Sequence, residues 1–307
     1  MMHFSFMGQR HQRSKLNLSL QSAQLEPYPA SCPICASDHL RLMLRVDFSR
    51  RHDQLARFGT RPIYHCRQCG HRFMNMVDLP SESFSEQYNA DYAGFCSDSY
   101  FQRVVRQELV ENLTPRVPPP AAVLDVGCGN GDFLAAATEF GYTGFGIDIS
   151  AAAIAHCQQR GLLAEVADLA SLQGRDRFDL ITLWDVVEHL PNPHAFIRQA
   201  FQLLRPGGYL LIKTPRVSSF TFQMVKRYPR LAGILLQTPD HIQFFRRSTL
   251  STLLQHNGFE RIDWLKDRNM RSRPPTRSFR KTVSRFVIRM ADRLGRNGNF
   301  YVMAQKP

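Results

Sequence analysis

No apolar run in this 307-residue chain approaches the ~18 consecutive residues that a membrane-spanning helix requires. The chain also lacks the apolar core of a secretory signal, and it contains no internal repeat. Acids are scarce near both ends. Residues 1–25 contain three lysines and arginines and no acid, and residues 266–296 contain eleven lysines and arginines and only two aspartates. These segments carry almost all of the formal net charge of +13, so the rest is not a basic nucleic-acid platform.

The missing export signals predict a cytoplasmic protein. Residues 1–30 are predicted to form a disordered tail, although the acid-free composition of residues 1–25 also resembles a mitochondrial transit peptide. Residues 276–294 are predicted to form a basic amphipathic helix. That helix is either a lid on the domain or a peripheral contact with anionic membrane lipid, made by the insertion at 267–298.

The most informative segment is a glycine-rich turn that follows the apolar run 121–124 and Asp125. Its three spaced glycines are Gly127, Gly129 and Gly131. Glycine allows a sharp turn and a close approach to a ligand, and amides at the start of the next helix suit a polar ligand group. Asp148 ends the next apolar run about 20 residues further on, which is the place of the ribose-binding acid in a Rossmann-type unit.

Two acids in this region indicate which cofactor the turn holds. Asp132 stands where the dinucleotide fingerprint has its third glycine, and Asp125 places a carboxylate at the tip of the strand. A carboxylate there would repel a pyrophosphate and attract an ammonium or sulfonium group. The sequence therefore favours S-adenosylmethionine over NAD.

From about Ala121 to the C-terminus, the chain resembles the class I S-adenosylmethionine-dependent methyltransferases. The matching motifs are LDVGCGNGDF (124–133), GIDIS (146–150), Ala167-Asp168-Leu169, FDLITLWDVVEHL (178–190), LLRPGGYLLIKTP (203–215) and HIQFFRRSTLSTLLQHNGF (241–259). The resemblance implies an α/β fold: a Rossmann-like, mostly parallel seven-stranded sheet with helices on both faces, closed by antiparallel strands at 260–266 and 299–305.

The resemblance also implies roles for individual residues. Gly127 and Gly129 would face the methionine portion of the cofactor, and Asp148 would hold the ribose hydroxyls. Asp168 and the amide of Leu169 would meet the adenine. The full expected cofactor-binding set is Asp125, Gly127, Cys128, Gly129, Asp148, Ile149, Asp168, Leu169 and Trp184.

Three polar residues follow the strand predicted at 178–184: Asp185, Glu188 and His189. Their i, i+3, i+4 spacing predicts one helical turn with all three side chains on one face. His189 is the candidate general base for an acceptor hydroxyl. Alternatively, the three bind a divalent cation with His241 as a fourth ligand, or they are structural. Related small-RNA 3′-end and ubiquinone-pathway O-methyltransferases carry a Glu-x-x-Glu-His metal motif here, whereas this chain begins the motif with an aspartate.

Four of the seven cysteines form two C-x-x-C pairs: Cys32 with Cys35, and Cys66 with Cys69. Two such knuckles predict a tetrahedral Cys₄ zinc site that holds a small module folded. Two disulfides are the alternative, which the absence of an export signal disfavours. The predicted organisation is a zinc-ribbon-like module at 31–78, a connector and helix at 79–120, and a methyltransferase domain at 121–307 with insertions at 216–240 and 267–298.

The acceptor is less well defined than the cofactor. The apolar and basic residues of the insertions are expected to line the acceptor side. A zinc-knuckle module before this domain resembles bacterial methyltransferases of surface-glycan and secondary-metabolite pathways, including sugar C-methyltransferases, which carry a further C-terminal domain. We therefore expect O-methylation of a small molecule or glycan. An RNA-modifying methyltransferase and a sugar C-methyltransferase are the alternatives.

Overall fold

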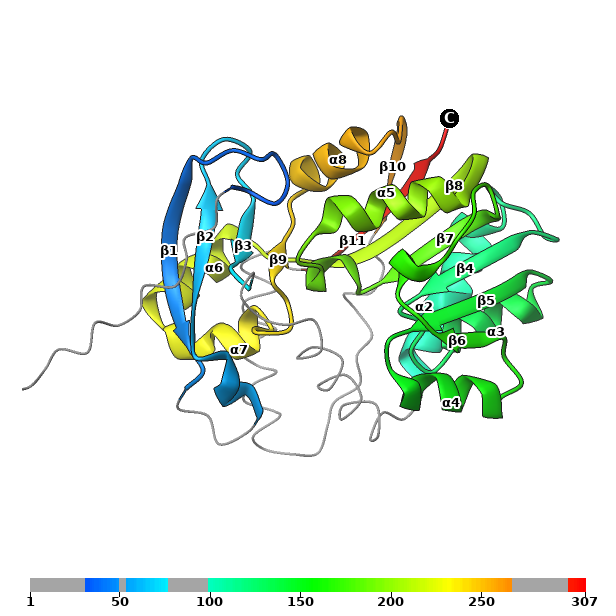
Figure 1. Cartoon of the computed structure of the whole chain (residues 1–307), viewed down its shortest axis with the longest axis horizontal. Helices are drawn as coiled ribbons and strands as arrows, with labels where there is room; N and C mark the ends of the chain where they lie inside the picture. The colour runs from blue at the N-terminus through cyan, green and yellow to red at the C-terminus, as the bar shows by residue number, and fades with distance from the viewer. Residues whose placement is uncertain (1–30, 50–53, 77–98, 267–297) are drawn as a thin grey trace, which may run out of the picture.

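Seven strands form the larger of two sheets in this computed structural model, which describes residues 31–49, 54–76, 99–266 and 298–307 (Figure 1). They are β4 (Ala122–Val126), β5 (Thr143–Asp148), β6 (Ala164–Val166), β7 (Phe178–Trp184), β8 (Leu204–Arg216), β10 (Arg261–Leu265) and β11 (Gly298–Gln305). The spatial order is β10-β11-β8-β7-β4-β5-β6. β4 to β8 pair in parallel, and β11 is antiparallel to both β8 and β10. The predicted sheet and its antiparallel closing pair are therefore confirmed.

Helices cover both faces of this sheet. α2 (Ser99–Glu108) and α3 (Asp132–Glu139) bury their apolar side chains on one face. On the other face lie α5 (Pro193–Leu203) and α8 (Arg247–His256). α4 (Ala151–Gln159) packs through Ile154 and Cys157 against α3. The side chain of Ser150 caps the start of α4: it accepts from the amide of Ala153, which satisfies one of the unpaired donors there.

The smaller sheet has the order β1-β2-β3-β9. Its strands are β1 (Leu40–Asp47), β2 (Thr60–Cys66), β3 (Arg72–Met74) and β9 (Gln243–Phe244), all paired antiparallel. Two helices of the first insertion, α6 (Ser219–Arg227) and α7 (Ala232–Leu235), lie beside this sheet in Figure 1. Phe222, Val225 and Leu235 from these helices share one core with Leu44 and Ile63 of the sheet.

The cysteine module and the methyltransferase domain therefore do not have separate cores, although the sequence predicts separate segments. β9 belongs to the later segment but pairs with β3 of the module. Cys32, Ile34 and Cys66 in turn are buried in the core that covers α5 and α8. The insertion at 216–240 was expected to line the acceptor side. Its buried apolar side chains instead pack on the module, because the open face of the four-stranded sheet needs a cover.

The strands predicted at 178–184, 260–266 and 299–305 are β7, β10 and β11, and each bound agrees to within one residue. Within the predicted connector and helix at 79–120, α2 is followed by a π-helical turn at Leu109–Leu113. The predicted tail, most of the connector and the amphipathic helix at 276–294 lie outside the described residues. Among the helices that are described, none combines the length and the apolar character needed to cross a bilayer.

Candidate active site and cysteine centre

The glycine-rich turn leaves the end of β4 at the point where the strand order reverses between β5 and β7, which is where open α/β sheets bind ligands. Gly127, Gly129 and Gly131 all have positive φ, at 69°, 51° and 75°. A Cβ on Gly127 would lie 2.8 Å from Cγ2 of Val186, in the turn after β7. The glycines are therefore needed both for the backbone conformation and for contact between the two turns.

Two buried acids hold this turn in place. The amide of Gly129 donates to Oδ2 of Asp148 at 2.9 Å, and the amide of Ser150 donates to Oδ1 at 2.8 Å. Asp125 is 2% exposed and accepts from the hydroxyl of Thr182 at 2.7 Å. Burial raises the pKa of Asp125 to about 8 and also raises the pKa of Asp148. Asp125 is thus a carboxyl group that a nearby cationic ligand would ionise.

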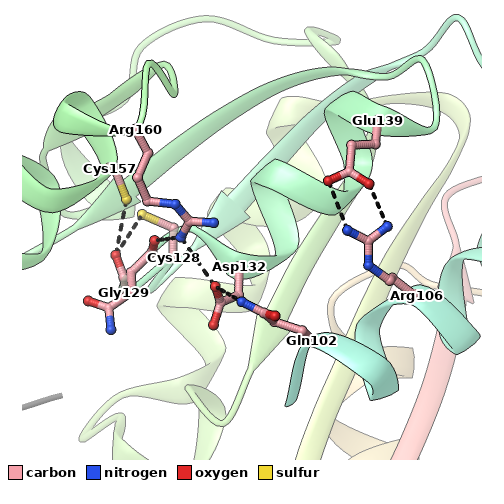
Figure 2. Close-up of polar contacts among 9 residues, drawn as sticks. Gln102, Arg106, Cys128, Gly129, Asp132, Glu139, Cys157 and Arg160 are labelled. Carbon is pink, nitrogen blue, oxygen red and sulfur yellow. Dashed lines mark hydrogen bonds and ion pairs between the residues drawn. The ribbon is translucent and has the colours of Figure 1, made fainter. Parts of the chain in front are cut away.

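The thiol of Cys128, an expected cofactor residue, is buried between α3 and α4. It packs with Leu134, Ile154 and Cys157, and its own amide donates to the carbonyl of Ile147. Figure 2 shows Cys128 and Cys157 converging on the carbonyl of Gly129, to which the Cys157 thiol donates at 3.2 Å. A direct cofactor contact by the Cys128 side chain is therefore not supported by its position.

The start of α3 is also held from outside. Gln102 of α2 and Arg160 after α4 both donate to Oδ1 of Asp132, at 3.1 and 3.2 Å (Figure 2). Arg106 of α2 and Glu139 of α3 form a two-bond ion pair. The connector helix thus braces the helix that begins at the glycine turn.

The remaining cofactor residues lie at the ends of neighbouring strands. Ile149 follows β5 and is 40% exposed, which is unusual for a large apolar residue beside buried acids. Asp168 caps the short helix at Leu169–Ser171, and Leu169 itself is buried. Trp184 is buried between Phe101, Phe133 and Tyr301, in the core that covers one face of the sheet. These positions are compatible with a cofactor site at the ends of the parallel strands. Each individual contact with the cofactor stays a prediction.

The turn after β7 corrects one expectation. Asp185, Glu188 and His189 do not share a helical face, because Asp185 has a φ of 56° and lies before the 3₁₀ turn at Val187–His189. The carboxylate of Asp185 pairs instead with Lys213 on β8. Asp185 is therefore not part of the group that could hold a metal.

Glu188 and His189 form a different triangle with His241. Oε1 of Glu188 lies 4.0 Å from Nε2 of His189 and 4.0 Å from Nε2 of His241. Glu188 is 1% exposed, its Oε2 accepts from Thr214 at 2.8 Å, and its Oε1 has no hydrogen-bond partner. One ligand atom from each of the three residues lies within 4.8 Å of the others, a spacing that suits a cation.

The protonation of this triangle follows from its surroundings. Because a carbonyl can only accept, the 2.7 Å contact with the carbonyl of Asp240 places the proton of His189 on Nδ1 and leaves a lone pair on Nε2. Burial lowers the pKa of His189 and lowers the pKa of His241 to about 3. Burial and the charge of Asp185 raise the pKa of Glu188 to about 8. Both rings are therefore neutral at pH 7.

The four predicted cysteine ligands meet between the two knuckles. The sulfur atoms of Cys32 and Cys69 are 3.7 Å apart, and those of Cys35 and Cys66 are 3.6 Å apart. These separations are too long for disulfides, and all four sulfurs lie within 4.8 Å of one another. Ligands about 2.3 Å from a tetrahedral zinc ion lie about 3.8 Å apart, so the residues fit this ion.

Some residues of the site had no signal in the sequence. Lys213, Thr182 and Thr214 become partners of the acids only because β7 lies between β4 and β8 in the sheet. His71, directly before β3, and Gln243, on β9, lie far apart in the sequence and meet through a buried hydrogen bond because these two strands pair. Strand order, rather than local spacing, creates each of these pairs.

This fold and turn define a Rossmann-like S-adenosylmethionine-dependent methyltransferase. A family model described as a methyltransferase domain matches residues 97–263, and the chain belongs to that family. The predicted class and its cofactor, S-adenosylmethionine, are therefore confirmed.

Two curated relatives carry the same name. The ubiquinone biosynthesis O-methyltransferase of Pseudomonas fluorescens (strain SBW25) is 34% identical over 152 residues, covering 44% of this chain and 63% of that protein. The protein of that name from Coxiella burnetii (strain RSA 331 / Henzerling II) is 30% identical over 150 residues, covering 46% of this chain and 64% of that protein. The chain thus matches less than two thirds of the length of these relatives.

Solved structures share the fold at lower identity. Phosphoethanolamine N-methyltransferase 2 of Haemonchus contortus, bound to S-adenosyl-L-methionine, aligns with a TM-score of 0.54 and 15% identity over 87% of this chain and 68% of that chain. The [4+2]-cyclase SpnF aligns with a TM-score of 0.52 and 20% identity over 75% of this chain and 97% of that chain. An N-methyltransferase and a [4+2]-cyclase thus share this fold, so the fold alone does not define the reaction.

Proposed function

We propose that this protein transfers a methyl group from S-adenosylmethionine to a hydroxyl of a small molecule or glycan, with His189 as the general base. The carrying observation is the bond from Nδ1 of His189 to the carbonyl of Asp240, which leaves Nε2 free of a proton. The turn that holds His189 contacts the glycine turn through Val186. The O-methyltransferase names of the relatives support the same reaction type.

Methyl transfer to a hydroxyl requires two things from the protein: positioning of the acceptor and removal of its proton. Holding the acceptor oxygen about 3 Å from the methyl carbon and in line with the sulfonium supplies much of the acceleration. Removal of the hydroxyl proton by a positioned base contributes a further ~10²–10⁴-fold. His189 is neutral at pH 7, so its ring can accept a proton, whereas the burial that lowers its pKa also weakens it as a base.

The test is His189→Ala, measured with labelled S-adenosylmethionine and a panel of phenols, catechols and sugars. We expect turnover to fall ~10²–10⁴-fold while cofactor affinity is unchanged. His156→Ala, at an exposed histidine of α4, is the matched control and should keep full activity. Full activity of the His189→Ala protein would remove this residue as the base.

The alternative is that Glu188, His189 and His241 bind a divalent cation. The unpartnered Oε1 of Glu188, which faces both histidines, favours this arrangement. Such a cation would lower the pKa of a coordinated acceptor hydroxyl. Dialysis against EDTA separates the two roles: lost activity that returns with Mg²⁺ or Mn²⁺ supports the cation, and unchanged activity supports the base alone.

We also propose that the cysteine cluster holds one structural zinc ion. The sulfur separations and the burial of Cys32 and Cys66 in the domain core support this assignment. Burial raises the pKa of the Cys35 thiol to about 11, whereas zinc binds the deprotonated thiolate. The bound ion would therefore displace protons from this cluster and stabilise the two knuckles.

One observation favours RNA modification as a second candidate. Arg41, His65 and Arg72 stand directly opposite one another on β1, β2 and β3, and therefore share one face of the sheet. The positive charges of Arg67 and Arg246 also contribute to lowering the pKa of His65. None of these four arginines (41, 67, 72 and 246) forms an ion pair within the described part of the chain. RNA affinity that falls steeply between ~50 and ~200 mM salt would support this candidate.

A further inference from the structure

The chain segment at 240–243 lies between the catalytic turn and the cysteine module, and it is bonded to both. On the side of the turn, the amide of Ile242 donates to the carbonyl of Glu188 at 2.9 Å. The Nδ1 proton of His189 is donated to the carbonyl of Asp240 at 2.7 Å. On the side of the module, the amide of Met74 donates to the carbonyl of Ile242 at 2.8 Å. The segment therefore transmits the position of β3 to Glu188 and His189.

The side chain of Gln243 extends this link to the second knuckle. Its Nε2 lies 2.9 Å from the carbonyl of Leu190, which can only accept, so this atom donates. Its Oε1 then faces Nε2 of His71 at 2.8 Å, and that ring nitrogen must be the donor. Both side chains are buried, His71 completely, so water does not replace these bonds at low cost.

His71 is itself part of the knuckle. The amide of Cys66 donates to the carbonyl of His71 at 2.8 Å, which closes the turn that contains Cys66 and Cys69. The His71 ring stacks on Phe73 and lies 5.2 Å from Phe245, between ring centroids. Displacing the knuckle therefore moves the ring that holds Gln243.

We propose that His71 and Gln243 are positioning residues, through which the metal-loaded second knuckle sets the orientation of Glu188 and His189. The inference rests on the proposed function only in naming the turn catalytic. Displacement of a reacting group by about 1 Å can cost ~100-fold in rate, so a link of this kind controls turnover without touching substrate.

The two knuckles provide a matched pair of variants. His71→Phe removes the donor to Gln243 and keeps a ring in the aromatic stack. His194→Phe removes the bond from the first knuckle, in which Nε2 of His194 contacts the carbonyl of Ile34 at 2.9 Å, and leaves β9 untouched. Gln243→Met removes both bonds of the link, whereas a glutamate at this position could still donate to Leu190 when its buried carboxyl is protonated and is therefore not used.

The test follows the full-length, metal-loaded protein by amide hydrogen exchange and by the ring ¹⁵N shifts of His189. For His71→Phe and Gln243→Met, we expect exchange of the Ile242 amide to accelerate about tenfold. His189 should lose its Nδ1–H tautomer, while affinity for S-adenosylmethionine is unchanged. Neither change should occur in His194→Phe. Removing the zinc from the wild-type protein with EDTA, and then returning Mg²⁺ so that only the cysteine cluster is left without its ion, should reproduce both changes.

Hydrogen exchange and the ring ¹⁵N shifts can be measured without an acceptor substrate. Their outcome therefore does not depend on whether the proposed methyl transfer is correct. Unchanged exchange and tautomer in both variants would overturn the link, as would the same changes in His194→Phe, which would indicate general loosening. If Gln243→Met fails to fold, His71→Phe alone carries the test, because it breaks only the bond to Gln243 and keeps a ring in the aromatic stack. Wild-type signals that survive metal removal would overturn the role of the metal.

Discussion

The amide of Gly129 donates to the carboxylate of Asp148 at 2.9 Å, so the acid at the end of β5 holds the glycine turn in its binding shape. Asp148 accepts from the amide of Ser150 with its other oxygen and also from the backbone of Ile149, so about one of the four lone-pair sites of the carboxylate stays available for a ligand hydroxyl. One side chain thus serves the turn and, as we propose, the ribose.

Replacing Asp148 should therefore weaken cofactor binding for two reasons. Asp148→Ala removes the ribose acceptor and the support of Gly129, and we expect affinity for S-adenosylmethionine to fall roughly 100-fold by calorimetry. Asp148→Asn retains one acceptor oxygen and should lose less. Wild-type affinity in the alanine variant would contradict the ribose assignment.

Asp125 should make stability depend on pH. Burial raises its pKa from 3.8 to about 8. Between these two pH values the folded protein keeps a proton that the unfolded chain has lost, so the free energy of unfolding decreases as the pH rises. His71 and His241, whose pKa values fall to about 4 and 3, act oppositely, but only below about pH 6.5. We expect the Tm of the cofactor-free protein to fall between about pH 6.5 and 8.

Asp125→Asn should flatten part of that fall, and Glu188→Gln should flatten another part, because burial also raises the pKa of Glu188 to about 8. Thermal unfolding followed by circular dichroism over this range measures the slope. A slope in Asp125→Asn equal to that of the wild type would show that Asp125 is already ionised in the fold.

Glycine substitutions separate backbone strain from packing. Gly131 and Gly161 have φ of 75° and 73°, so alanine costs each about 1–2 kcal/mol of conformational energy. A Cβ on Gly131 would lie 2.5 Å from Leu162 and 2.9 Å from the sulfur of Cys157, whereas Gly161 faces open space. Chemical denaturation should show Gly131→Ala less stable than Gly161→Ala by about 1–3 kcal/mol. Equal losses would indicate that the turn relaxes without cost.

The zinc proposal has a direct elemental test. Purified protein should contain about one zinc ion per chain, and Cys66→Ser should lose most of it together with thermal stability. Cys157→Ser is the control, since its hydroxyl can still donate to the carbonyl of Gly129 and it lies outside the cysteine cluster. Retention of a full zinc complement by the Cys66→Ser protein would contradict the four-cysteine site.

The sequence predicted those parts of the fold that depend on local pattern. Apolar runs such as 178–184 predicted strands that the structure contains. The two C-x-x-C pairs likewise predicted the four sulfur atoms that lie close together. The positive φ of the three turn glycines also follows from residue type. These features need only the period of apolar side chains and the steric freedom of glycine.

The prediction failed where distant segments decide the geometry. The spacing of Asp185 from Glu188 suggested one helical face, but a pairing with Lys213 on the neighbouring strand draws Asp185 out of it. The insertion at 216–240 looked like an acceptor surface because its apolar residues had no visible partner. Their partners, Leu44 and Ile63, lie more than 150 residues earlier in the chain.

The two residues of β9 limit how this protein can be divided or recombined. An excised fragment ending at residue 76 would lose the strand that completes its sheet, and Cys32, Ile34 and Cys66 would be stripped of the helices that cover them. Transplanting the cysteine module onto another enzyme would require carrying residues 216–245 with it. The cysteine module and residues 216–245 therefore have to stay together in any fragment or fusion.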